Sequence, residues 1–105
     1  MKESSFNAQK IVIYAENTRE IYFSFLAPLR QQLTRRLVSG KDVDLEHLAE
    51  CSTMKKIVCE CVKLFKKYGE SVPTTTERKE ASTEIANLLI EQAMDEAQEM
   101  MHETM

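Results

Sequence analysis

Glycine and proline are scarce in this chain, whose 105 residues include two of each. Tight turns and bulges depend on these residue types, so an all-β fold with many chain reversals is disfavoured. A chain of 105 residues can bury about two-thirds of the surface that its unfolded form exposes. That is enough for one core and argues against a multi-domain enzyme. These features predict a single helical domain spanning residues 1–105.

The sequence contains neither a membrane span nor a secretory signal. Its longest uninterrupted apolar run, 11–15, has five residues, far below the roughly 20 that a membrane-spanning helix needs. The first residues lack the apolar stretch of a secretory signal, and the three cysteines are an odd number at irregular spacing. We therefore expect a cytoplasmic protein with reduced thiols and no membrane partner.

Apolar residues at intervals of four predict an amphipathic helix between residues 17 and 39. Asn17 followed by Glu20 resembles a capping box and would begin this helix, and Gly40 fits its end. Pro28 lies inside it, so we expect a kink there or a division into two shorter helices. The apolar stripe is Ile21, Phe25, Leu29, Leu33 and Leu37.

Two further helical segments are predicted in the second half of the chain. The first runs from 45 to 68, with Asp44 as its N-cap and Gly69 after its end. Ser52 and Thr53 can divide it into a short and a longer helix. The second opens with a capping box formed by Thr74 and Glu77. Its inward residues are predicted to be Ala81, Ile85, Leu88, Leu89, Ala93, Ala97 and Met100.

The region 10–25 has two interpretations. Residues 11–14 and 21–25 are rich in β-branched and aromatic side chains, which is typical of a hairpin that turns through 16–19. A lone two-stranded hairpin would need covering to be stable, and the four-residue spacing continues unbroken to Leu37. We therefore favour helix, and expect an all-α bundle of four or five helices.

Charge is segregated along the chain. Residues 30–69 carry nine bases against five acids, whereas residues 70–105 carry two bases against nine acids. The lysines of the segment 45–68 fall within about 120° of one another on a helix. They form the lysine face: Lys55, Lys56, Lys63, Lys66 and Lys67. The opposite, buried arc is predicted to hold Met54, Ile57, Cys61, Leu64, Phe65 and Tyr68.

The lysine face has two interpretations. A row of ammonium groups can contact a phosphate backbone, and a nucleic-acid site would add Arg35 and Arg36. We favour the simpler interpretation of a solvated face, or of one balanced by the acidic last helix, because the whole chain has a net charge of −3. No aromatic residue interleaves with the lysines, which argues against base stacking on a single strand.

Cys59 lies among these lysines, with Lys55 and Lys63 each four residues away. Neighbouring ammonium groups favour thiolate over thiol, so Cys59 is predicted to be the most reactive of the three cysteines. An incidental surface cysteine is the simpler interpretation.

Methionines accumulate near the end of the last helix. Methionine is flexible and suits adaptable helical contacts. After Ala93 the inward stripe thins to Ala97 and Met100, which is too little to bury the end of the helix in the core of one chain. This end of the helix either frays or packs against another chain. The predicted self-association residues are Met94, Met100 and Met101.

No catalytic constellation or cofactor motif is present in the sequence. His47 and Cys51 are four residues apart, but two ligands do not make a metal site. We expect no enzymatic activity, no metal, no cofactor and no small-molecule substrate. The sequence predicts a small helical module that binds another protein, a second copy of itself included; the alternative is nucleic-acid binding through the lysine face.

Overall fold

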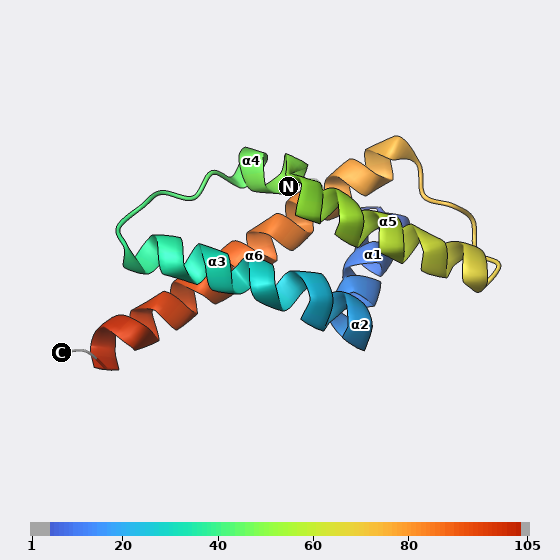
Figure 1. Cartoon of the computed structure of the whole chain (residues 1–105). Coiled ribbons are helices and arrows are strands. Elements are labelled where there is room, and N and C mark those ends of the chain that lie inside the picture. Colours follow the sequence, from blue (N-terminus) through green and yellow to red (C-terminus); the bar gives the residue numbers. More distant parts are fainter. Residues whose placement is uncertain (1–4, 104–105) are drawn as a thin grey trace.

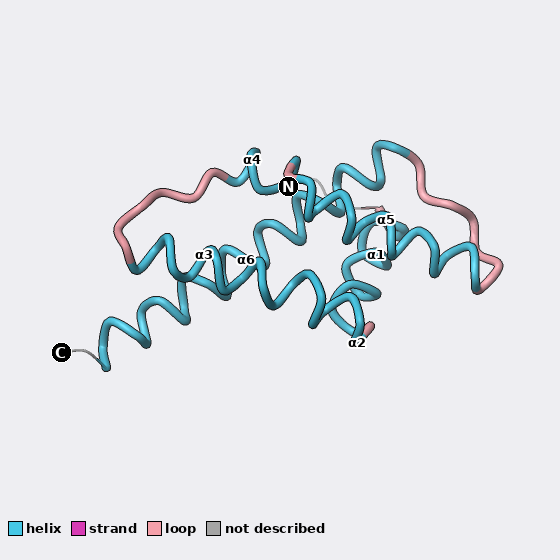
Figure 2. Tube along the Cα trace, in the orientation of Figure 1, coloured by secondary structure: helices cyan, strands magenta, loops and turns pink. Residues whose placement is uncertain are grey.

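The computed structural model describes residues 5–103, and every regular element in that range is a helix (Figures 1 and 2). The predicted all-α fold is confirmed, and the alternative hairpin over 10–25 is wrong. Five helices have six residues or more, and a three-residue helix and a π-helical turn join the first two of them. The elements are α1 (Phe6–Asn17), α2 (Arg19–Ile21), η1 (Tyr22–Leu26), α3 (Ala27–Val38), α4 (Leu45–Glu50), α5 (Ser52–Lys67) and α6 (Thr75–Glu103).

Helix α1 forms because one of its faces is buried. Its β-branched residues do not pair as a strand, since Ala8, Ile11 and Ala15 lie on one side of a helix and are fully covered. The Ser5 hydroxyl accepts a hydrogen bond from the Ala8 backbone N–H at 3.2 Å and caps the helix. The helix start expected at Asn17 is wrong. Asn17 ends α1, and its amide donates back to the Ile13 carbonyl at 2.9 Å.

The kink expected at Pro28 takes the form of a wider turn. In η1 the Ala27 N–H bonds to the Tyr22 carbonyl, five residues back, immediately before the proline. Pro28 has no N–H, and in an unbroken α-helix its ring would clash with the Ser24 carbonyl. A π-helical turn accommodates such a disruption without ending the helix, so the chain continues directly into α3.

The other helix ends follow the predicted signals. Gly40 and Gly69 adopt positive φ angles of 79° and 69° just after α3 and α5, where a side chain would be strained. The Asp44 carboxylate accepts the Glu46 N–H at 2.9 Å and caps α4. Thr74 and Glu77 form the predicted reciprocal capping box, at 2.8 and 3.2 Å. The predicted division near Ser52 occurs between α4 and α5.

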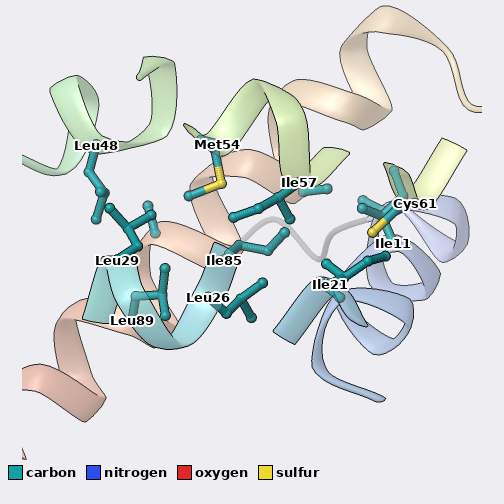
Figure 3. Close-up of a cluster of buried hydrophobic side chains, with 14 of the residues drawn as sticks. Ile11, Ile21, Leu26, Leu29, Leu48, Met54, Ile57, Cys61, Ile85 and Leu89 are labelled. Atoms are coloured by element: carbon teal, nitrogen blue, oxygen red, sulfur yellow. The ribbon is translucent and has the colours of Figure 1, made fainter. Parts of the chain in front are cut away.

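Helix α6 is the centre of the fold, because α1, α3, α4 and α5 all pack against it. Figure 3 shows Ile85 and Leu89 of α6 among side chains from α3, α4 and α5. The largest fully buried side chains come from four elements: α1, η1, α5 and α6. They are Phe65, Ile11, Leu26, Met54, Ile57, Ile85, Leu89 and Cys61.

Two residues predicted to face the core are exposed. Tyr68 is 60% exposed because it follows the last residue of α5, where the backbone leaves the helix. Met100 is 44% exposed, and it belongs to the end of α6, which extends past the body of the fold (Figure 1). Within residues 5–103, no helix combines the length and hydrophobicity needed to cross a membrane.

Candidate interaction surfaces

The lysine face lies on the outer side of α5. All five of its lysines are exposed, while Met54, Ile57, Cys61 and Phe65 on the opposite side of the same helix are completely buried. This division follows from the sequence spacing, since residues three and four apart share a helix face. The face extends over about 18 Å at 1.5 Å per residue.

The acidic last helix forms no direct ion pair with the lysine face among the described residues. Lys63 pairs with Glu60 on α5 itself, at 2.9 Å, and this carboxylate raises the pKa of Lys63. The other ion pairs found within residues 5–103 join Lys10 to Glu70 and Arg30 to Glu96. In the described part of the chain, α6 therefore does not balance the lysine face through direct ion pairs, and the five lysines of that face are exposed to solvent.

Arg35 and Arg36 do not extend the lysine face. Both are exposed, but they lie near the end of α3, and the Arg36 guanidinium donates to the Asp42 carbonyl at 3.2 Å. The C-terminal ends of α3 and α5 lie at opposite sides of the molecule (Figure 1). A contact that uses Lys66 and Lys67 is therefore separate from one that uses the two arginines.

An aromatic side chain borders the lysine face. The Lys67 ammonium lies 5.9 Å from the centre of the Tyr68 ring, and the centres of the Tyr68 and Tyr14 rings are 6.1 Å apart. Glu70, nearby, accepts from the Tyr14 hydroxyl and pairs with Lys10. This arrangement was not predicted, because the helical spacing placed Tyr68 in the buried arc. The position of Tyr68 next to Gly69, at a helix end, was the sequence feature that could have indicated its exposure.

The cysteines of α5 occupy opposite environments. Cys59 is exposed within the lysine face, and its interaction with Lys63 helps to raise the pKa of that lysine. Cys61 is buried in the core, and burial raises the pKa of its thiol to about 12. The thiol of Cys59 is therefore accessible to solvent, and the thiol of Cys61, two residues later, is not.

The second surface, the methionine end, is the last part of α6. It is defined by Met94, Met100 and Met101, which are 47%, 44% and 45% exposed. Among residues 75–102 of this helix, Ala97 is the last buried one, and residues 98–102 are all exposed. The methionine end therefore carries an apolar surface past the edge of the core.

Carboxylates lie beside the methionines on the same helix. Glu91, Asp95 and Glu99 are exposed and follow one another at intervals of four, so they form one row along α6. Met94 lies about 60° around the helix from Glu91 and about 100° from Asp95, at 100° per residue. Apolar and acidic side chains thus share this exposed side of the helix.

Two grooves open on the surface. One, of about 400 Å³, lies between α3 and α4 and is lined by His47 and Cys51 among others. The other, of about 410 Å³, lies between α4, α5 and α6 and mixes Lys55 and Arg78 with Glu46 and Glu50. No group of three or more His, Cys, Asp or Glu residues within the described range could hold a metal ion.

Comparison with known proteins finds no family model, no curated protein and no solved structure that matches this chain.

Proposed function

We propose that this protein is a non-enzymatic interaction module that assembles with itself through the methionine end of α6. The observation that carries the proposal is the exposure of Met94, Met100 and Met101, each between 44% and 47%, on one helix end. Methionine side chains are flexible and polarizable, which suits them to contacts between helices. Covering them would remove apolar surface from water and stabilise the assembled form.

The length of α6 supports the same proposal. The helix has 29 residues, while α3, which packs along it, has 12. Residues 98–102 at the end of α6 are helical and exposed. A second chain packed against them would cover the apolar side chains that this end presents to water.

The experiment is size-exclusion chromatography with light scattering, on the wild type and on Met94→Gln/Met100→Gln/Met101→Gln. Glutamine keeps the size and helix propensity of methionine but is polar. The wild type should exceed the 12.1 kDa of one chain increasingly with concentration, and the triple variant should remain a monomer. The control is Ile13→Gln, which removes another exposed apolar side chain, from α1. A triple variant that associates like the wild type would contradict the proposal.

A second candidate function is nucleic-acid binding, supported by the lysine face. Its five lysines are exposed, and Tyr68 at its end offers an accessible ring on which a base could stack. Fluorescence anisotropy with labelled duplex DNA, single-stranded DNA and RNA, at low and physiological salt, tests it. Lys63→Glu/Lys66→Glu should weaken binding to every sequence and flatten its salt dependence. Unchanged binding would remove the lysine face as the contact.

The proposal includes a cytoplasmic location. Cys59 is an exposed free thiol, and such thiols persist in a reducing compartment.

A further inference from the structure

We infer that copies of this chain associate head to tail, with the methionine end of one copy docked on the lysine face of the next. The inference rests on the proposed self-association and adds the second surface and the orientation. It follows from three observations: the charges beside the methionines, the size and few ion pairs of the lysine face, and the positions of the two surfaces in the fold.

The charges beside the methionines oppose a symmetric contact. Glu91, Asp95 and Glu99 are exposed next to Met94. If two methionine ends packed against each other, the two rows of carboxylates would share one interface. Like charges at an interface are unfavourable and commonly exclude such a pairing. The methionine end therefore fits a basic surface better than it fits itself.

The lysine face is a basic surface of suitable size. The acidic row, from residue 91 to residue 99, covers about 12 Å at 1.5 Å per residue, and the lysine face covers about 18 Å. Of the five lysines of the lysine face, only Lys63 forms an ion pair within the described range, with Glu60, so the other ammonium groups can face a second chain. Lysine side chains also carry long apolar stems that can pack on methionine while the ammonium reaches a carboxylate.

The two surfaces cannot meet within one chain. Helix α5 lies on one side of the molecule and the end of α6 projects from the other (Figure 1). The molecule measures 51 Å along its longest axis. A contact between unlike surfaces of identical chains is heterologous, and it generates a ring or an open filament. Because the attraction is between exposed charges, added salt should weaken it.

The test uses two charge-reversal variants of the full chain. Lys63→Glu/Lys66→Glu disables the lysine face, and Asp95→Lys/Glu99→Lys disables the acidic row. Both leave Glu96, which pairs with Arg30, in place. Each variant alone should sediment as a monomer. Their equimolar mixture should associate, because each variant retains the surface that the other lacks and the two reversed surfaces also carry opposite charges. Salt should dissociate the mixture.

Matched controls separate the contact from net charge. Arg19→Glu/Lys41→Glu changes the charge as much as the lysine-face variant does, and Glu16→Lys/Glu20→Lys as much as the acidic-row variant. All four positions are exposed and lie on neither surface. Both controls should self-associate like the wild type. Circular dichroism melts of all variants verify that each is folded.

The outcomes distinguish this inference from the proposal on which it rests. If the wild type associates and either charge-reversal variant still associates with itself equally well, the head-to-tail contact is wrong while self-association stands. If the wild type is monomeric at every concentration and salt, self-association itself fails. If the wild type is monomeric but binds a labelled oligonucleotide, and Lys63→Glu/Lys66→Glu abolishes that binding, the lysine face serves nucleic acid.

Discussion

At the scale of the residue, exposure and burial set the chemistry of the cysteines in α5. Cys59 is exposed beside lysines, and Cys61 is buried with a pKa raised to about 12. The reactive species is the thiolate, and a thiol with so high a pKa supplies almost none at neutral pH. Two cysteines separated by one residue should therefore differ strongly in reactivity.

We predict that Cys59 reacts with an alkylating reagent faster than Cys51 and Cys61. The measurement is iodoacetamide labelling at neutral pH, followed over time by peptide mass spectrometry. Cys61 should label only when denaturant unfolds the chain, which serves as the control for intrinsic reactivity. Equal rates for all three cysteines in the folded protein would refute the assignment.

Truncation of Phe65 should lower the free energy of unfolding more than truncation of most other residues. Its ring is completely buried and meets the Tyr14 ring edge-on at 5.3 Å. Phe65→Ala should destabilise the protein by about 4 kcal/mol, because it removes buried apolar surface and leaves a cavity. Urea unfolding followed by circular dichroism measures this. The control is Tyr68→Ala, because Tyr68 lies three residues away and is 60% exposed in the native protein. A similar loss of unfolding free energy in both variants would contradict the burial of Phe65.

At the scale of the element, the capping box of α6 links stability to pH. The backbone N–H of Thr74 donates to the Glu77 carboxylate at 2.8 Å and lowers its pKa from the ordinary value of 4.5. A carboxyl group with a lower pKa in the folded state stabilises it at neutral pH. That contribution is lost as the pH falls from the ordinary pKa through the folded one.

We therefore predict that acidification destabilises the wild type more than it destabilises Glu77→Gln. Glutamine can accept the same hydrogen bond but does not titrate. Urea midpoints of both proteins, measured from neutral to strongly acidic pH, should converge below the folded pKa of Glu77. If the urea midpoints of the two proteins ran parallel over the whole pH range, Glu77 would not contribute to the pH dependence of stability.

Helix ends and apolar periodicity were the most predictable parts of this fold. The caps at Asp44, Thr74 and Gly69 depend on local hydrogen bonds and backbone angles, so short sequence patterns identify them. The wider turn before Pro28 was predictable as a disruption. Its π-helical form was not, because it depends on how the flanking turns pack.

The candidate surfaces were predictable only where one helix contains them. The exposure of the lysine face follows from the amphipathic spacing of α5. The separation of Arg35 from Lys67, and the position of Tyr14 beside Tyr68, depend on how helices far apart in the sequence pack. The exposure of Met100 likewise depends on how far α6 extends past the body of the fold, which no pattern in α6 itself reveals.

At the scale of the whole molecule, the segregation of charge along the chain becomes a segregation in space. The basic surface lies on α5, and the acidic and methionine-bearing surface lies at the far end of α6. Oppositely charged surfaces on one molecule attract copies of that molecule, and this attraction weakens as salt screens it. The separation of these two surfaces is what the proposed head-to-tail assembly requires.

Self-association is the central claim, and sedimentation equilibrium of the wild-type chain tests it most directly. The measurement covers low to high micromolar protein, at low and at high salt. The account predicts an average mass that rises with concentration above the 12.1 kDa monomer and returns toward it when salt is added. A mass of 12.1 kDa under every condition would contradict the claim.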